Sequence, residues 1–156
     1  MTLSAWVKSE DSTGEIISIG DNAGMKFASD STGFGIYCYY SYGDETSWLP
    51  IGSRIESTDH RWHYISVVID SGTGMISLYI DGALMSEAEM IGEMIYNKTG
   101  AGTYIGQGFR EANNLQGWID EVKVSNVVRS GAWVKLCYEN QRMDQTLVTY
   151  HVTFGY

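Results

Sequence analysis

Tyrosines on a predicted β-strand are the residues of this chain best suited to chemistry. In the segment 34–42, Ile36 and Cys38 occupy alternate positions and so mark the core-facing side of a strand. Tyr37 and Tyr39 then point to the opposite, outer side. A tyrosine ring can stack on the C–H face of a sugar ring while its hydroxyl exchanges hydrogen bonds with sugar hydroxyls. The strand is therefore a candidate carbohydrate-binding surface.

Two further tyrosines follow the same alternation. Tyr64 alternates with apolar residues in the segment 62–70, and Tyr79 does so in the segment 75–81. Both segments also carry serine at outward positions. We expect four tyrosines to share one outer sheet face and to bind sugar there, namely Tyr37, Tyr39, Tyr64 and Tyr79. The alternative is that tyrosines on neighbouring strands only stabilise the sheet through cross-strand pairs.

Two loops add candidate sugar contacts. Trp48 lies near the turn at 42–47, where an exposed indole would serve as a stacking platform, although a tryptophan there can equally close one end of the fold. The loop that begins at Gln107 also holds Arg110 and Asn113, whose guanidinium and amide groups suit sugar hydroxyls. A solvated loop without a binding role is the alternative for these residues.

Asp120 has the same alternation as Trp118, Val122 and Val124, which predicts that both Asp120 and Trp118 lie on the buried face of a strand. A buried carboxylate must be paired, hydrogen-bonded or bound to a metal ion. Calcium would satisfy it together with main-chain carbonyl oxygens, and Asp21 in a glycine-flanked turn would add a ligand. Alternatively, Asp120 accepts hydrogen bonds from backbone N–H groups at a strand edge.

Catalysis finds little support in the pattern of carboxylates and histidines. Glycosidases hold two carboxyl groups across the bond that they cleave, whereas Asp120 and Glu121 are followed by Val-Lys-Val and lack such spacing. The three histidines have no serine or cysteine nucleophile pattern around them. We therefore expect a protein that is not an enzyme, with an unrecognised glycosidase as the alternative.

The composition limits the class of protein and of partner. The 156 residues carry a net charge of −9 and include 18 glycines, 11 tyrosines and a single proline. An acidic surface argues against nucleic acid and against anionic membranes. No stretch approaches the roughly 20 apolar residues of a membrane span. The two cysteines, Cys38 and Cys137, either form a disulfide or remain thiols.

Short alternating segments separated by glycine-rich turns must position these side chains. About ten such segments are present, with no alternation of strands and helices, which favours an all-β antiparallel sandwich. One short helix is predicted to begin at Ser130, because Val134, Cys137 and Tyr138 follow with helical spacing. A last strand is predicted over 147–154, where apolar and polar residues alternate.

Four motifs, taken in order, resemble one known family. They are Leu-Ser-Ala-Trp-Val-Lys at 3–8, Arg-Trp-His-Tyr-Ile at 61–65, Leu-Tyr-Ile-Asp-Gly at 78–82 and Gly-Trp-Ile-Asp-Glu-Val-Lys-Val at 117–124. Together they resemble the laminin-G-like, concanavalin-A-like jelly-roll domains of bacterial extracellular proteins. The resemblance implies one jelly-roll domain over 1–156, a secreted protein, and often a structural calcium that an aspartate at the place of Asp120 can ligate. Relatives commonly bind carbohydrate or mediate adhesion.

Such domains usually begin with several strands before the first motif, and we expect those strands to be absent here. The predicted strand over 147–154 then takes their place, or the open sheet edge pairs with a second copy in a homodimer. Trp6, Trp62 and Trp133 lie within framework motifs and are expected to pack inside the fold. The sequence thus predicts a non-catalytic module that binds a neutral polysaccharide weakly. The alternative is an adhesion or structural domain whose partner is a protein.

Overall fold

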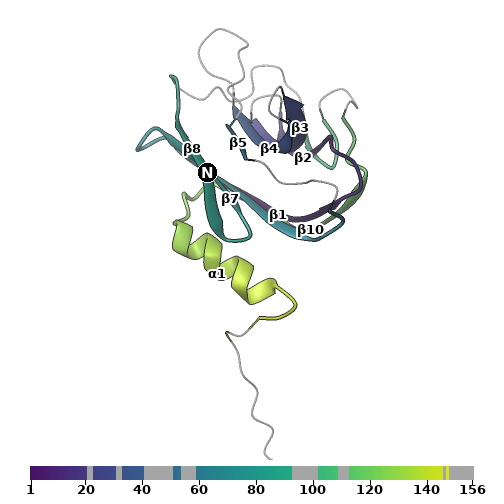
Figure 1. The fold of residues 1–156 in the computed structure, drawn as a ribbon. Coiled ribbons are helices and arrows are strands. Elements are labelled where there is room, and N and C mark those ends of the chain that lie inside the picture. The colour runs from purple at the N-terminus through teal and green to yellow at the C-terminus, as the bar shows by residue number, and fades with distance from the viewer. Residues whose placement is uncertain are drawn as a thin grey trace, which may run out of the picture.

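Two five-stranded antiparallel sheets pack face to face in the computed structural model, and a helix covers the outer side of one of them (Figure 1). Sheet A has the strand order β10-β1-β6-β7-β8, and sheet B has the order β5-β4-β3-β2-β9. The predicted antiparallel sandwich is therefore confirmed. The structure describes the residues 1–20, 23–30, 33–40, 51–53, 59–92, 102–108, 113–145 and 147.

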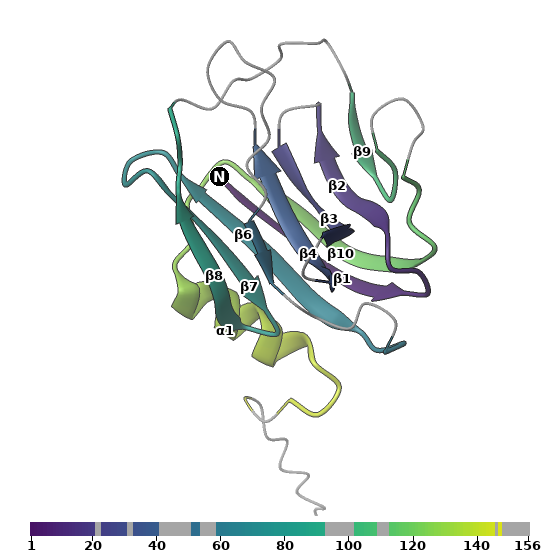
Figure 2. The same ribbon diagram turned by 45° about the horizontal axis from the view of Figure 1, so that its top comes forward.

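The elements follow the chain as short strands and a late helix. The strands of sheet A are β1 (Thr2–Ser9), β6 (His63–Asp70), β7 (Met75–Ile80), β8 (Ala83–Glu89) and β10 (Gly117–Ser125). The strands of sheet B are β2 (Gly14–Ile19), β3 (Ala23–Asp30), β4 (Gly33–Tyr40), β5 (Ile51–Ser53) and β9 (Thr103–Ile105). Helix α1 (Gly131–Gln141) follows β10, and Figure 2 shows it beyond sheet A, on the side away from sheet B. None of the helices in the described residues is long and apolar enough to cross a membrane.

The main core lies between the sheets and is built from the apolar residues that alternate along each strand. The predicted inward positions are confirmed on β4 by Ile36 and Cys38, and on β6 and β7 by residues such as Val67 and Leu78, all of which are buried. Each large apolar side chain contributes roughly 1.5–3 kcal/mol by leaving water. This core holds the sandwich rigid and fixes which side chains of each strand face outward.

Helix α1 covers a second, smaller core on the outer face of sheet A. Its Val134 is fully buried and packs with Tyr64 and Val68 of β6. Ser130 caps the helix, because its side-chain oxygen accepts a hydrogen bond of 3.2 Å from the backbone N–H of Trp133. The predicted helix is confirmed, and Val134, Cys137 and Tyr138, whose spacing predicted it, all pack toward sheet A.

The β7–β8 turn shows how closely the helix approaches the sheet. Asp81 and Gly82 both have positive φ, 51° and 75°, as a two-residue hairpin turn requires. A Cβ atom at Gly82 would lie 3.1 Å from the ring of Tyr138 and 3.2 Å from the Cα of Lys135. Gly82 therefore serves both the turn and the contact with α1.

Strand β10 contains a bulge that overturns two predictions. Ser4 pairs with Lys123 and Trp6 pairs with Asp120, so β10 has one residue more than β1 in this interval. Glu121 takes up the extra length with a φ of 51°. Alternation restarts at the bulge, so Trp118 is 50% exposed and Asp120 is exposed as well. The prediction that Trp118 and Asp120 face the core is wrong.

The two cysteines are free thiols on separate layers of the fold. Cys38 is buried on β4, and its thiol donates to the carbonyl of Ile51 at 3.4 Å. Burial raises the pKa of Cys38 to about 12, which leaves it unreactive. Cys137 lies on α1 and packs with the core beneath that helix. The sequence left a disulfide open, and the structure excludes it within this chain.

The strand predicted over 147–154 lies outside the described residues except for Leu147, which is 49% exposed. The prediction that this segment closes a sheet edge therefore stays a prediction. The same holds for the homodimer, because the structure contains one chain. The edges that the sheets present in the described residues are β10 and β8 of sheet A and β5 and β9 of sheet B.

Candidate functional site

The four predicted tyrosines do not share one face. Tyr37 and Tyr39 lie on β4 in sheet B, whereas Tyr64 and Tyr79 lie on β6 and β7 in sheet A. The outer faces of the two sheets point away from each other. Alternation predicts the side of its own strand to which a residue points, but it does not show which sheet contains that strand. The prediction of a single tyrosine surface is therefore wrong.

The two tyrosines of sheet A pack beneath α1. Tyr64 is fully buried, and its ring centroid lies 5.4 Å from that of Trp6. Burial raises the pKa of Tyr64 to about 12. Tyr79 is half-buried, and its hydroxyl would lie 3.0 Å from a Cβ atom placed at Gly131. Tyr64 is thus a packing residue and cannot contact a sugar in this structure, which corrects its predicted role.

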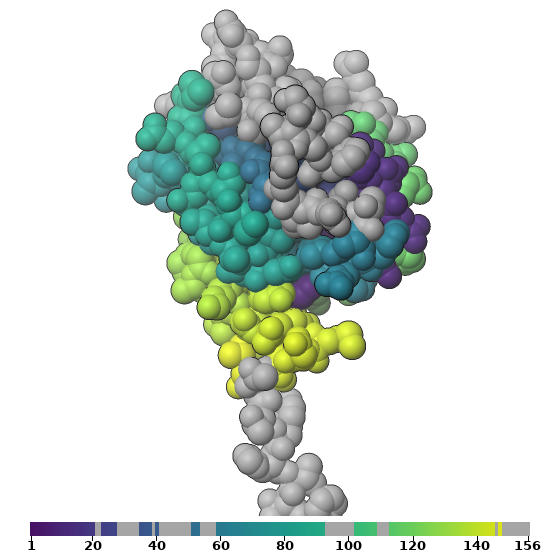
Figure 3. All heavy atoms as spheres, viewed as in Figure 1, coloured from purple at the N-terminus to yellow at the C-terminus, as the bar shows by residue number. Residues whose placement is uncertain are grey.

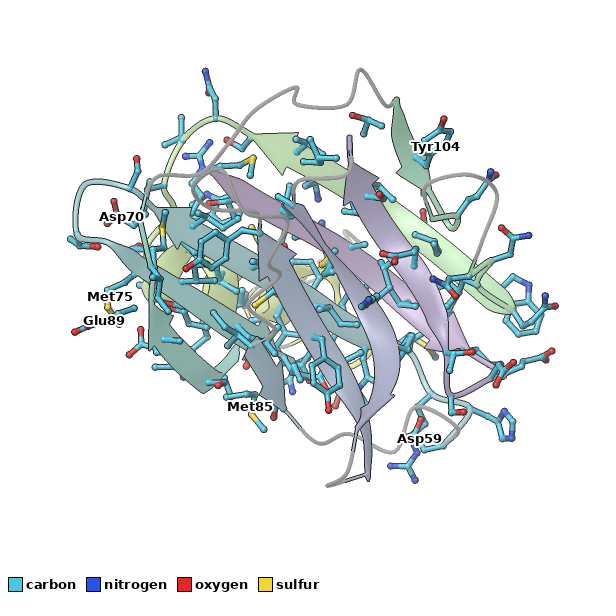
Figure 4. The ribbon with its side chains drawn as sticks, turned by 90° about the horizontal axis from the view of Figure 1, so that it is seen from above. Asp59, Asp70, Met75, Met85, Glu89 and Tyr104 are labelled. Carbon is cyan, nitrogen blue, oxygen red and sulfur yellow. The ribbon has the colours of Figure 1, made fainter. Side chains whose placement is uncertain are left out.

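The outer face of sheet B places a tyrosine beside a charged residue. Tyr37 is half-buried and pairs with Lys26 on one side and with Gly52 on the other. Its ring fills the space over Gly52, where a Cβ atom would lie 2.7 Å away. The sequence did not single out Tyr104 of β9, which pairs with Ser18 at the edge of this sheet (Figure 4).

The remaining predicted contacts are only partly described. Gln107 is half-buried and Asn113 is exposed, and the backbone carbonyl of Asn113 accepts a 2.8 Å hydrogen bond from the backbone N–H of Glu15 in β2. The residues outside the described part are Asp21, Trp48 and Arg110, together with the side chain of Tyr39. Their predicted roles stay predictions.

Asp120 lies on the outer face of sheet A and not in the core. One of its carboxylate oxygens accepts a 2.8 Å hydrogen bond from the backbone N–H of Glu121. This is the alternative that the sequence left open for Asp120. Among the described residues, no group of three or more His, Cys, Asp or Glu side chains is arranged to hold a metal ion. Calcium binding stays a prediction. The buried carboxylate that suggested it, Asp120, is exposed in the structure.

A pocket of about 620 Å³ opens where the last turn of α1 meets the outer face of sheet A. We call it the α1 pocket. In the space-filling view, α1 and the residues after it form a ledge beneath the sandwich (Figure 3). The walls of the α1 pocket come from β1, β10, the segment before β6 and the end of α1. The lining residues are Trp6, Trp62, Asp120, Glu121, Tyr138, Gln141, Arg142, Met143 and Asp144.

Three aromatic side chains line the α1 pocket. Trp62 is 43% exposed, so its ring is accessible to a ligand. Trp6 and Tyr138 lie with their ring centroids 5.8 Å apart. The indole N–H of Trp6 donates a 2.8 Å hydrogen bond to the side-chain oxygen of Gln141. These contacts hold Trp6 and Tyr138 in place and leave Trp62 as the free aromatic surface.

Charged groups surround these rings. Asp120, Glu121 and Asp144 contribute carboxylates, and Arg142 contributes a guanidinium group. Arg142 Nε lies 2.8 Å from a carboxylate oxygen of Glu139 and 3.6 Å from one of Asp144. An arrangement of exposed indole, carboxylates and amide can stack on an apolar ring face and accept hydrogen bonds from hydroxyl groups.

Comparison with known families places the fold. The family model described as the concanavalin A-like lectin/glucanases superfamily matches residues 1–135. The chain belongs to this superfamily. No functionally described protein was found whose sequence matches this concanavalin A-like domain.

Solved structures share the fold at low sequence identity. The CBM40 of the Ruminococcus gnavus IT-sialidase, bound to α2,3-sialyllactose, has a TM-score of 0.69 at 14% identity, with 88% of this chain and 81% of that chain covered. Domain 4 of AbnA, a GH43 extracellular arabinanase from Geobacillus stearothermophilus, in complex with arabinotriose, has a TM-score of 0.62 at 17% identity, covering 86% and 64%. A SAP-like pentraxin from Limulus polyphemus has a TM-score of 0.68 at 20% identity, covering 91% and 70%.

The concanavalin A-like domain fixes Trp62 through a histidine clamp. His63 Nδ1 lies 2.8 Å from an Asp81 oxygen, and Nε2 lies 3.1 Å from an Asp59 oxygen. The hydrogen bond to Asp81 is the largest effect on the pKa of His63, and this pKa is raised. Asp59 also accepts a 2.8 Å hydrogen bond from the backbone N–H of Arg61. The clamp therefore ties the segment that carries Trp62 to the β7–β8 turn.

Sequence reasoning missed the α1 pocket because its two tryptophans, Trp6 and Trp62, were assigned to packing. Trp6 and Trp133 do pack against the core between α1 and sheet A as expected, but Trp62 is exposed, which corrects its predicted role. The signal available in the sequence was the pair Asp120 and Glu121, two adjacent carboxylates on a strand. Adjacent strand residues normally point to opposite faces, so one of the two must face outward unless both lie at an edge.

Proposed function

We propose that this concanavalin A-like domain is a non-catalytic carbohydrate-binding module that holds part of a polysaccharide chain in the α1 pocket. The observation that carries the proposal is the exposed Trp62 ring set beside carboxylates and an amide in one pocket. The pocket volume of about 620 Å³ also falls in the range of small-molecule sites, about 300–1,000 Å³.

The chemistry of binding follows from these groups. The Trp62 face would stack on the axial C–H bonds of a sugar ring, because both surfaces are apolar and flat. The Asp120 and Asp144 carboxylates would accept hydrogen bonds from sugar hydroxyls, and such charge-assisted bonds are the stronger kind. A few contacts of this type must offset the ordering of a flexible chain. We therefore expect dissociation constants of about 10 µM to 1 mM.

The absence of a catalytic role is part of the proposal. Asp120 and Glu121 are neighbours at the β10 bulge, so they do not flank a bond in the way that glycosidase carboxylates do. Solved structures of the same fold include domains described as bound to sialyllactose and to arabinotriose, and one belongs to an extracellular arabinanase. On the basis of these two domains, we propose that the protein acts outside the cell, where polysaccharide is found.

A second candidate function is adhesion to a protein partner. It is favoured by exposed apolar side chains that follow one another from the end of β10, namely Val124, Val127 and Val128, which are 43–54% exposed. Contiguous exposed apolar side chains often mark protein interfaces. These residues do not line the α1 pocket, so the two functions can be tested with separate variants.

The experiment uses affinity gel electrophoresis on a panel of soluble plant, algal and bacterial polysaccharides, followed by calorimetry on the best ligand. Trp62→Ala should abolish retardation, because it removes the stacking surface. The matched control is Trp118→Ala, since Trp118 is 50% exposed on the same sheet but does not line the pocket. Retardation that survives Trp62→Ala and fails in Tyr37→Ala would place the site on sheet B instead. Loss of partner adhesion in Val127→Ser, without any glycan binding, would favour the second candidate.

A further inference from the structure

We infer that the α1 pocket selects glycans by charge: it accepts uncharged or amine-bearing chains and rejects chains that carry carboxylate or sulfate groups. The inference rests on the proposed function and names the ligand class of that same pocket. It comes from the way in which the ionic groups in and around the pocket are paired.

The cation that lines the described pocket is already engaged. Arg142 Nε lies 2.8 Å from Glu139 and 3.6 Å from Asp144, and the guanidinium carbon is 5.8 Å from the centroid of the Tyr138 ring. Only 28% of the Arg142 side chain is exposed. The contacts involve Nε, so an acidic sugar that approached the remaining N–H groups of Arg142 would come close to the Glu139 and Asp144 carboxylates and be repelled by them.

Two of the cations around the pocket also contact other groups of the protein. Lys123 Nζ lies 2.8 Å from Glu121, whose other contact is the Gln141 amide at 3.5 Å. Lys8 Nζ lies 4.9 Å from the centroid of Trp118, outside the pocket. Arg61, next to Trp62, is exposed and forms no ion pair with another described residue.

The acceptors, in contrast, are available. Asp120 is exposed and uses one carboxylate oxygen for the backbone N–H of Glu121, which leaves the other oxygen open to a ligand. The side chain of Asp144 is 83% exposed. Carboxylate oxygens accept hydrogen bonds and do not donate them, so they match the hydroxyl and ammonium groups of a ligand. A sugar carboxylate or sulfate would meet like charges, which act against binding.

This charge pattern separates the α1 pocket from a site for acidic sugars. Recognition of a carboxylate or sulfate usually relies on an arginine whose paired N–H groups remain free for the ligand. The R. gnavus CBM40, a domain of similar fold, is described as bound to sialyllactose, which carries a carboxylate. The fold is therefore compatible with acidic ligands elsewhere, and the exclusion inferred here comes from this chain's own ion pairs.

The test compares matched polysaccharides that differ in charge on one backbone. Hydroxyethylcellulose, carboxymethylcellulose and chitosan share a β-1,4-linked chain with neutral, acidic and amine groups; dextran and carboxymethyl dextran form a second pair, and neutral xylan and glucuronoxylan a third. Affinity electrophoresis should show at least about tenfold weaker retardation by the acidic member of any pair whose neutral member binds. Added salt should weaken binding to chitosan and leave the neutral ligand nearly unaffected.

A double variant, Asp120→Asn with Glu121→Gln, tests the cause. It removes two negative charges and frees Lys123, so retardation by the acidic polysaccharide should rise toward that by the neutral one. The matched control is Glu89→Gln, an exposed carboxylate on β8 at the opposite edge of sheet A, which should change nothing (Figure 4).

The outcomes distinguish the two proposals. If no polysaccharide of the panel retards the wild-type protein, the proposed function fails. If acidic members bind as well as their neutral counterparts while Trp62→Ala still abolishes binding, the function stands and the charge selection fails. If the double variant leaves acidic polysaccharides excluded, the ion pairs described here are not the cause and the inference is overturned.

Discussion

The indole N–H of Trp6 and the side-chain oxygen of Gln141 lie 2.8 Å apart, and this hydrogen bond ties the middle of β1 to the last residue of α1. The residues at its two ends line the same pocket. The bond therefore couples the packing of the helix to the shape of the candidate site. Stability and ligand binding should respond together when α1 is loosened.

Replacing Gln141 by Ala should expose this coupling. The Trp6 N–H would lose its acceptor in a partly buried place, at a cost of about 1 kcal/mol in the free energy of unfolding. Urea denaturation measures this loss, and calorimetry measures the accompanying decrease in glycan affinity. Asn140→Ala, at the neighbouring exposed helix position, is the control. Equal effects of the two variants would show that the hydrogen bond has no particular role.

Substitutions at two glycines with nearly the same φ can distinguish the effect of backbone strain in a turn from the effect of packing against α1. Gly82 has a φ of 75° and Gly74 a φ of 73°. A Cβ at Gly82 would press on Tyr138 and on the helix backbone, whereas a Cβ at Gly74 would meet nothing within 4 Å. Both alanine variants should lose about 1–2 kcal/mol through backbone strain.

Gly82→Ala should therefore lose a further 1–3 kcal/mol, roughly, because the added methyl group overpacks the contact with α1. Thermal unfolding of the two variants gives the difference directly. Only Gly82→Ala should also weaken glycan binding, since it alone displaces the helix that forms the pocket. If Gly74→Ala is as destabilised as Gly82→Ala, the described contact between α1 and the hairpin is wrong.

The His63 clamp predicts a stability that falls with rising pH. The pKa of His63 is raised in the folded protein, chiefly by its hydrogen bond to Asp81. The stabilisation is therefore fully present below the ordinary histidine value of about 6.5. It is lost as the pH rises through the higher folded value, because the neutral ring can no longer donate to both Asp81 and Asp59.

The midpoint of thermal unfolding should thus decrease across this interval, and His63→Asn should remove most of the decrease. His60→Asn is the control, because His60 is exposed on the same segment and asparagine tolerates its positive φ. Glycan affinity should follow the same pH profile, since the clamp holds the segment of Trp62. A profile that His63→Asn leaves unchanged would contradict the role of the clamp.

Much of the sandwich is readable from the sequence because alternation reports burial on each strand. Leu3, Ala5 and Val7 show this on β1, where all three are fully buried. The helix is equally readable, since Ser130 is a capping residue and Val134 begins a helical apolar face. In both cases a local pattern of residues carries the physical information.

The candidate site was not readable, because it depends on features that no local pattern encodes. The bulge at Glu121 reverses the alternation of β10 and turns Asp120 outward, and a positive φ on a glutamate has no sequence signature. The assignment of Tyr37 and Tyr64 to different sheets depends on strand order. The pocket itself brings Trp62 to residues about 60–80 positions away, through the pairing of β10, β1 and β6 and the packing of α1 on that sheet.

Binding of a glycan in the α1 pocket can be followed at the indole N–H signals of the five tryptophans in a ¹H–¹⁵N NMR titration. The titrant is an oligosaccharide from whichever neutral polysaccharide retards the protein most, with signals assigned from single Trp→Phe variants. The Trp6 and Trp62 signals should shift with one common dissociation constant while the Trp118 signal stays in place. Saturation of binding with unmoved Trp6 and Trp62 signals would contradict binding in this pocket and place the ligand elsewhere on the sandwich.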